Sequence, residues 1–371
     1  MESFLIDNKK ISPLQFGLLV VIFTIGSSIL LTPSGLANIA KQDAWVASLF
    51  GIGLSIIVII IFSILARRYP CKTFVEYCEI ILGKWLGKII AVSFVYFCFF
   101  GASSLLFDMG NFMITQIMPE TPIEILNIVF ALVILYGLRL GIEVIARTAE
   151  IFFPWISLLL LLLVIAVIPQ IELTNIQPVF EADLKTVTHG AIVYASTAGM
   201  PCVVFTILIP LLNKQKKIGR TFVTANILGG IVITVITFTS IGVLGPDTTS
   251  RVTFPSYVLA KKISLADVLE RIEVIVAIIW FITLYFKIIL YFYASMIGTA
   301  QILGLTDYRP FLFPFVLLLV THSLIMYPNT IYEAEFNNSV WVAFALTIGF
   351  LLPILLLVIS ILRKKMKAIL K

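Results

Sequence analysis

The chain has 371 residues, of which 60% are hydrophobic and only 12% are charged, and its mean hydropathy is +1.09. A soluble globular domain does not need so large an apolar fraction for its core, so the composition excludes a soluble protein and indicates a polytopic membrane protein. The formal net charge of +6 does not indicate a nucleic-acid partner, because the basic residues are dispersed over short segments between apolar runs. We predict a single transmembrane domain over residues 1–371.

Apolar runs of about 20 residues, the length that crosses a bilayer core, recur from one end of the chain to the other. We predict ten membrane spans, at about residues 13–38, 43–66, 86–117, 122–139, 142–168, 187–212, 218–244, 267–302, 310–328 and 338–362. The segment between the seventh and eighth spans contains Pro246 and Pro255, and it is either a lid over the membrane domain or a plain connector.

The charge distribution predicts the orientation of the chain in the membrane. Lys9 and Lys10 stand directly before the first span, with no small-residue cleavage site after a short apolar core, so the first helix is predicted to be uncleaved. If this end is cytoplasmic, most of the 26 lysines and arginines fall on the cytoplasmic side, as the positive-inside bias requires. An even number of spans with both termini in the cytoplasm agrees with this bias.

Two of the predicted spans are interrupted near their middle. The first contains residues 25–33, with the sequence IGSSILLTP, and the sixth contains residues 196–201, with the sequence STAGMP. In hydrocarbon every backbone N–H and C=O must be satisfied, so a helix opens only where the freed groups line an enclosed cavity or hold a ligand. Breaks in spans one and six are typical of a five-plus-five inverted repeat, here at about residues 13–168 and 187–362.

Lys287 is the strongest candidate for a functional residue, because a charged side chain at mid-depth in a membrane is costly and rare. Thr283, Lys287 and Tyr291 are spaced four residues apart, so they share one face of the eighth span. We predict that Lys287 binds a ligand carboxylate or takes the place of a coupling cation. The alternative is a structural ammonium that is bonded to carbonyl groups of the broken helices.

Other polar groups within the spans are weaker candidates. Asp108 in the third span lies toward the outer boundary of the membrane, where hydration is cheap, and it is predicted to be structural. Gly101 on the same helix leaves room for a small ligand or for a close helix contact. Arg147 and Glu150, three residues apart in the fifth span, are predicted to neutralise each other, with a gating or coupling role as the alternative.

The sequence contains no nucleophile motif and no phosphate-binding loop, so it does not predict an enzyme or a cofactor. Cys71, Cys78, Cys98 and Cys202 do not have the spacing of metal ligands. Neither a metal site nor a disulfide is expected.

The first interruption resembles the motif in the first span of the amino acid/polyamine/organocation (APC) superfamily. Further motifs resemble, in the same order along the chain, those of the spore germination permease family, the B subunits of bacterial endospore germinant receptors. These motifs are Gly83-Lys84-Trp85, Thr121-Pro122, Arg147 with Glu150, Gly199-Met200, Glu270-Arg271-Ile272-Glu273 and the helix of Lys287 and Tyr291. The resemblance covers nearly the whole chain and depends on the ordered set, since each motif alone is weak.

The resemblance implies an all-α LeuT-type fold of ten transmembrane helices, with helices 1 and 6 broken, in the spore inner membrane. It also implies a subunit that senses an amino acid or a similar small nutrient and assembles with an A-type membrane subunit and a C-type lipoprotein subunit. The pocket residues that it implies are Gly26, Ser27, Ser28, Phe97, Gly101, Ala198, Gly199, Met200, Lys287 and Tyr291. Thr283 is added to this set from the polar stripe on the eighth span.

Three functions stay open from the sequence, because a fold does not determine a function. The first is the nutrient-sensing subunit, which the resemblance favours. The second is a proton-coupled amino acid or polyamine transporter, in which Lys287 or the pair of Arg147 and Glu150 exchanges charge. The third is a conducting or scaffold subunit whose cavity passes water or ions without a cognate ligand.

Overall fold

The structure, a computed structural model, describes residues 10–213, 217–262 and 272–369, with side chains described up to Arg363. The α-helices are α1 (Pro13–Ile25), α2 (Ser28–Ala40), α3 (Ala44–Arg68), α4 (Phe74–Leu82), α5 (Lys84–Phe112), α6 (Ile123–Leu140), α7 (Ile142–Val167), α8 (Leu184–Ala198), α9 (Ile218–Leu244), α10 (Pro246–Arg251), α11 (Pro255–Lys262), α12 (Glu273–Leu303), α13 (Leu312–Ile325), α14 (Thr330–Asn338), α15 (Val340–Leu346) and α16 (Leu352–Ile369).

Shorter helical segments extend or connect these helices. The 3-10 segments are η1 (Lys41–Asp43), η3 (Ile168–Gln170), η4 (Leu173–Asn175), η5 (Met200–Ile207), η6 (Ile209–Leu211) and η8 (Arg309–Phe311), and the π-helical turns are η2 (Met113–Ile117) and η9 (Thr347–Leu351). Within the described ranges, the β-type pairing consists of one isolated bridge between Ile11 and Leu212.

Eight helical stretches in the described part of the chain are long and apolar enough to cross a membrane, which confirms the all-α polytopic fold class. Two shorter apolar helices, α1 and the stretch Arg309–Ile325, lie within the predicted first and ninth spans. The count of ten spans and the division into two repeats stay predictions. The described residues do not include Lys9 or residues 267–271 of the predicted eighth span. Glu270 and Arg271 of the family motif fall in that second range.

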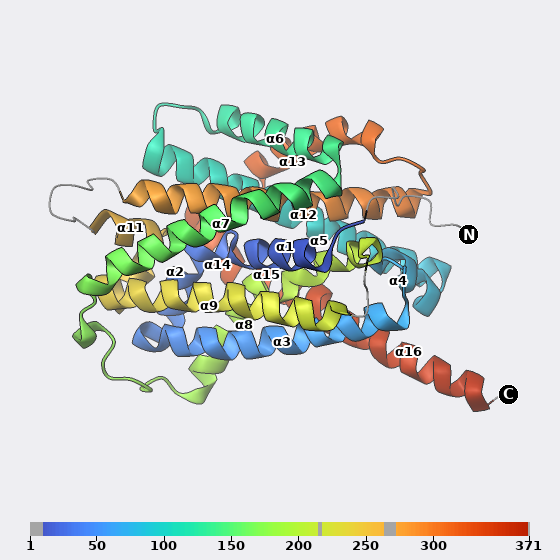
Figure 1. Cartoon of the computed structure of the whole chain (residues 1–371), viewed down its shortest axis with the longest axis horizontal. Helices are drawn as coiled ribbons and strands as arrows, with labels where there is room; N and C mark the ends of the chain where they lie inside the picture. Colours follow the sequence, from blue (N-terminus) through green and yellow to red (C-terminus); the bar gives the residue numbers. More distant parts are fainter. Residues whose placement is uncertain (1–9, 214–216, 263–271, 370–371) are drawn as a thin grey trace.

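Most helices run along the long axis of the molecule, and α12 packs against α5, α7 and α1 in its interior (Figure 1). By contrast, α6 and α7 leave about half of their large apolar side chains exposed, as helices that face lipid do. The first described residues and the end of α16 lie at the same end of the molecule (Figure 1), which requires an even number of crossings. That this end faces the cytoplasm stays a prediction from the charge distribution.

The first span is broken at the predicted place. Helix α1 ends where the N–H of Gly26 donates to the carbonyl of Ile22 at 2.8 Å, and α2 begins two residues later at Ser28. Gly26 has a φ of +22°, which a residue with a Cβ rarely adopts. The break therefore depends on the glycine, and it lies between two apolar half-helices in the interior of the protein.

The segment between the seventh and eighth spans packs onto the half-helix α2. Pro33 has no N–H, so the carbonyl of Ile29, four residues earlier, has no partner within the helix. The hydroxyl of Ser256 in α11 donates to this carbonyl. Ser34 of α2 also donates to the carbonyl of Ser250 in α10, at 3.3 Å. Thus α10 and α11 are tied to the broken first span, whether they act as a lid or as a connector.

Gly26→Ala is expected to destabilise the protein by about 1–3 kcal/mol, because the backbone conformation is strained for alanine. The new Cβ would also lie 2.8 Å from the carbonyl oxygen of Phe23 and would collide with the side chain of Lys287. The measurement is the melting temperature of the purified full chain in detergent. Gly53→Ala on α3 is the control, since its Cβ would meet nothing within 4 Å. Equal melting temperatures for Gly26→Ala and wild type would show that the break does not need glycine.

Candidate ligand-binding site

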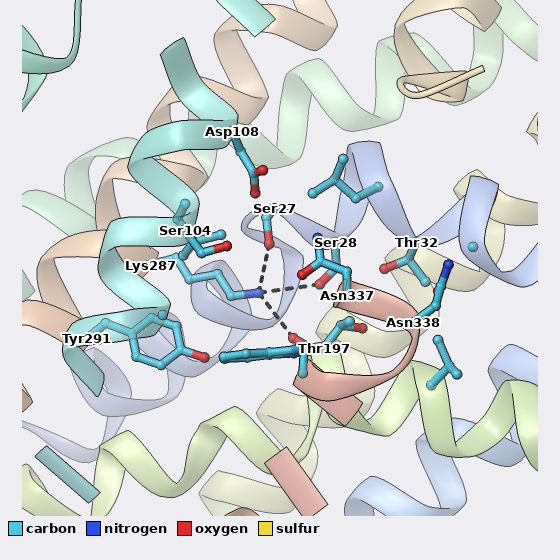
Figure 2. Close-up of a pocket in the computed structure, with 16 residues that line it drawn as sticks. Ser27, Ser28, Thr32, Ser104, Asp108, Thr197, Lys287, Tyr291, Asn337 and Asn338 are labelled. Carbon is cyan, nitrogen blue, oxygen red and sulfur yellow. Dashed lines mark hydrogen bonds between the residues drawn. The ribbon is translucent and has the colours of Figure 1, made fainter. Parts of the chain in front are cut away.

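The side chain of Lys287 in α12 joins the two helix breaks. Its Nζ donates to Ser27 Oγ at 3.1 Å and to Ser28 Oγ at 3.4 Å, which lie at the first break (Figure 2). The same atom donates to the carbonyl oxygen of Thr197 at 3.2 Å, which lies at the second break. An ammonium has three N–H donors, so these three bonds engage all of them. The two breaks therefore lie on either side of one ammonium group, which is 2% exposed.

Pro201 explains why the carbonyl of Thr197 is free to accept this bond. In an α-helix that carbonyl accepts from residue 201, but proline has no backbone N–H. Helix α8 therefore ends at Ala198, and the chain continues as the 3-10 helix η5. The neighbouring carbonyl of Ser196 accepts from Nε1 of Trp341 at 3.1 Å. The C-terminal end of a helix carries partial negative charge, so this place favours a cation.

Lys287 has no carboxylate partner in the part of the chain that the structure describes. The ion pairs within 4.0 Å there are Lys72 with Glu76 and Arg147 with Glu143. Hydroxyl and carbonyl oxygens therefore hold the ammonium, which retains a strong attraction for an anionic group in its low-dielectric surroundings. The site is electrostatically suited to a carboxylate.

A cavity of about 110 Å³ lies beside Lys287. By the same measure one water needs about 10–15 Å³, so the cavity has room for several waters or for one small organic molecule. Its wall consists of Ser27, Ser28, Leu31, Thr32, Gly35, Gly101, Ser104, Leu105, Asp108, Val193, Thr197, Lys287, Tyr291, Asn337, Asn338 and Trp341. The described residues contain no group of three or more His, Cys, Asp or Glu that could hold a metal ion.

The structure places five of the predicted pocket residues in the cavity wall, namely Ser27, Ser28, Gly101, Lys287 and Tyr291. Gly101 leaves the space that Tyr291 fills, because a Cβ at this position would lie 2.9 Å from the Tyr291 ring. Phe97 stands behind the wall and stacks on Trp341, with ring centroids 5.2 Å apart. Thr283 donates its hydroxyl to carbonyls of its own helix and, at 3.4 Å, to the carbonyl of Gly26.

The three predicted residues of the sixth span, Ala198, Gly199 and Met200, form the break without lining the cavity. A Cβ at Gly199 would lie 2.9 Å from the Cα of Ser55, so this glycine permits close packing of α8 against α3. Met200 approaches Gly349 of η9, where an added Cβ would lie 2.6 Å from the Met200 Cβ. Thr197 is the residue at the second break that lines the cavity.

The sequence analysis missed the cavity residues at the ends of α5 and α14. Asp108 lines the cavity and is 4% exposed, so it is not the hydrated residue near the outer boundary that the sequence predicts. Asn337 and Asn338 enter the same wall from α14. Two features of the sequence could have identified these residues: the acidic Asp108 within the third span, and the adjacent Asn337 and Asn338 before the last span.

The predicted pairing of Arg147 with Glu150 is wrong. Arg147 pairs with Glu143 one turn earlier on α7, with Nη2 and Oε1 2.6 Å apart, and its side chain is 67% exposed. Glu150 accepts instead from Nε2 of Gln15 in α1, at 3.1 Å. Glu143 is four residues from Arg147 on the same helix face, and Gln15 faces Glu150 from the neighbouring helix, so each residue has a nearer partner. Neither residue lines the cavity.

Comparison with known sequences identifies a family. The family described as "Spore germination protein" matches residues 10–334. The chain is 28% identical over 367 residues to spore germination protein KB of Bacillus subtilis (strain 168), an alignment that covers 97% of this chain and 96% of that protein. It is also 28% identical over 366 residues to spore germination protein YndE of the same strain, with coverage of 96% and 98%.

Solved transporter structures share the fold. The structure of MhsT in complex with L-phenylalanine aligns with a TM-score of 0.63 at 16% sequence identity and covers 95% of this chain and 99% of that chain. The structure of MHP1, a nucleobase-cation-symport-1 family transporter with bromovinylhydantoin bound, aligns with a TM-score of 0.61 at 14% identity and covers 91% and 76%. These likenesses confirm the predicted LeuT-type fold.

The family match extends over most of the chain, the curated relatives are matched along nearly their whole length, and the fold is that of membrane transporters. Together these findings indicate a multi-pass membrane protein that is not an enzyme. The chain belongs to the family of spore germination proteins.

Proposed function

We propose that the chain is the nutrient-sensing subunit of a spore germinant receptor and binds an amino acid or a similar small molecule in the cavity beside Lys287. It lies in the spore inner membrane with both termini in the cytoplasm. It assembles with an A-type membrane subunit and a C-type lipoprotein subunit, which read its conformation. The similarity to relatives named as spore germination proteins supports this proposal.

The observation that carries the proposal is the buried ammonium of Lys287, hydrogen-bonded to neutral oxygens, beside a cavity. A ligand carboxylate is a stronger acceptor for an ammonium than a hydroxyl or a carbonyl is. Because Lys287 also links the two helix breaks, a ligand that draws it away from Thr197 changes the bonds that hold the breaks together. Ligand binding then favours one arrangement of the helices over another.

Lys287→Met is expected to weaken the binding of a carboxylate-bearing nutrient by about tenfold or more, because a hydrogen bond to a charged group contributes about 1.5–3 kcal/mol. Methionine keeps an unbranched apolar side chain as far as Cε and lacks the ammonium. The measurements are titration of L-alanine and L-valine into the purified full chain in nanodiscs, and the nutrient dose response of spores that carry the variant.

Lys185→Met on α8 is the matched control, because Lys185 is exposed and outside the cavity wall. This variant should bind and respond like wild type. If spores with normal amounts of Lys287→Met protein show an unchanged dose response, Lys287 does not belong to the ligand site.

A proton-coupled amino acid or polyamine transporter is the second candidate, and the fold shared with MhsT and MHP1 favours it. In this function the cavity would open alternately to the two sides of the membrane, and Lys287 would exchange charge during the cycle. Arg147 and Glu150 do not form the pair that this candidate would use to exchange charge, because each has another partner.

Flux and germination assays separate the two candidates. The sensing proposal predicts that proteoliposomes of the purified chain do not concentrate labelled L-alanine or L-valine, because a sensor needs binding but no net transfer. It also predicts that spores of a deletion strain lose their response to the cognate nutrient. Robust concentrative uptake together with normal germination of the deletion strain would establish the transporter instead.

A further inference from the structure

Asp108 and Glu333 form a buried pair of carboxyl groups at the cavity. Asp108 comes from α5 and lines the cavity, whereas Glu333 comes from the first turn of α14 and stands behind it. Asp108 and Glu333 are 4% and 6% exposed, and their carboxyl groups act on each other electrostatically. Two carboxyl groups that interact in a buried place do not both ionise, so this pair holds a proton. With one shared proton it carries a single negative charge.

The groups around the pair leave this charge without a cationic partner. Nδ2 of Asn337 donates to Glu333 at 3.3 Å. The hydroxyl of Tyr327 lies near both carboxyl groups and is hydrogen-bonded to Ser104 at 3.0 Å. Lys287 is the cation whose charge acts on Asp108, but the described residues include no ion pair between them within 4.0 Å.

The helices that pack around α5 bring few other titratable groups to this place. Tyr291 of α12 lines the same cavity, and His322 of α13 lies more than two turns away along α5, against the rings of Phe99 and Phe100. Neither supplies a positive charge to the carboxyl pair.

The cavity wall also contains a polar atom with no partner. The hydroxyl of Thr32 is buried, it lines the cavity, and it makes no hydrogen bond to the protein. In Figure 2 the carboxyl of Asp108 and the ammonium of Lys287 point into one space beside Ser27, and Thr32 lies at its edge. A buried hydroxyl of this kind is satisfied when a ligand or a water occupies the cavity. The cavity is therefore built to hold a polar molecule.

We propose that the Asp108–Glu333 pair is the subsite for an ammonium group of the ligand, while Lys287 takes its carboxylate. This inference rests on the proposed function of the cavity. If the pair keeps its shared proton, the filled cavity contains two positive charges, on Lys287 and the ligand, and two negative charges, on the ligand and the pair. Charge balance matters because unpaired charges in a low-dielectric interior are costly. The ligand class is then a zwitterion such as an α-amino acid, in preference to a simple carboxylic acid, an amine or a sugar.

The test compares L-alanine with propanoate, which lacks the ammonium, and with ethylamine, which lacks the carboxylate, and compares L-valine with its two analogues in the same way. Binding is measured by titration into the purified full chain in nanodiscs. Wild type should bind each amino acid at least about tenfold more tightly than either analogue. Asp108→Asn/Glu333→Gln removes the negative charge and keeps the side-chain shapes, so it should bind the amino acid no better than the carboxylic acid.

Glu335→Gln is the matched control, because Glu335 is an exposed acid on the same helix α14 and lies outside the cavity wall. This variant should keep the preference for the amino acid, whereas Asp108→Asn alone, which removes the carboxyl that faces the cavity, should lose most of it. Asp108→Asn alone also tests the proposal if the double variant does not fold. A purely structural role of the pair would weaken the binding of the amino acid and of the carboxylic acid to Asp108→Asn equally.

The outcomes separate the two proposals. If the double variant, or Asp108→Asn where the double variant does not fold, prefers the amino acid over the carboxylic acid as strongly as wild type does, the ammonium subsite is wrong. Lys287 would still belong to a carboxylate site. If wild type binds none of the amino acids and carboxylic acids, the amino acid ligand of the proposed function fails as well.

Discussion

The structure depends on one buried ammonium group that is hydrogen-bonded to two broken helices. Removing the charge of Lys287 from water is costly, and three oxygen acceptors from the two breaks offset that cost. Those acceptors lie where the chain departs from regular helix, at Gly26 in one span and at Pro201 in the other. The same departure leaves a cavity next to the ammonium. Fold and candidate site therefore arise from one set of sequence features.

The two broken spans use proline in the same way. A proline frees the carbonyl four residues earlier, and a polar side chain from a distant segment takes it. Lys287 takes the carbonyl freed by Pro201, and Ser256 takes the carbonyl freed by Pro33. In a membrane protein these bonds are needed because lipid cannot satisfy an open carbonyl. They also connect the half-helices to α12 and α11.

The features that could be predicted from the sequence are those whose residues differ chemically from their immediate neighbours in the chain. The glycine-serine break, the proline after the second break and the mid-depth lysine all stand out against apolar surroundings, and the structure brings them together. Side-chain direction and partner choice could not be predicted. Gly199 and Met200 are in the break yet face α3 and η9, and Arg147 selects Glu143 over Glu150. Asp108 was placed near the membrane boundary because its depth was counted along one helix, whereas the structure buries it at a cavity that α14 also lines.

The most direct test of the proposed site is a cryo-EM map of the full chain in nanodiscs with a bound amino acid. We expect ligand density in the cavity, with the ligand carboxylate in contact with Nζ of Lys287 and the ammonium of the lysine displaced from the carbonyl of Thr197. Density for the ligand outside this cavity, with the three hydrogen bonds of Lys287 unchanged, would contradict it.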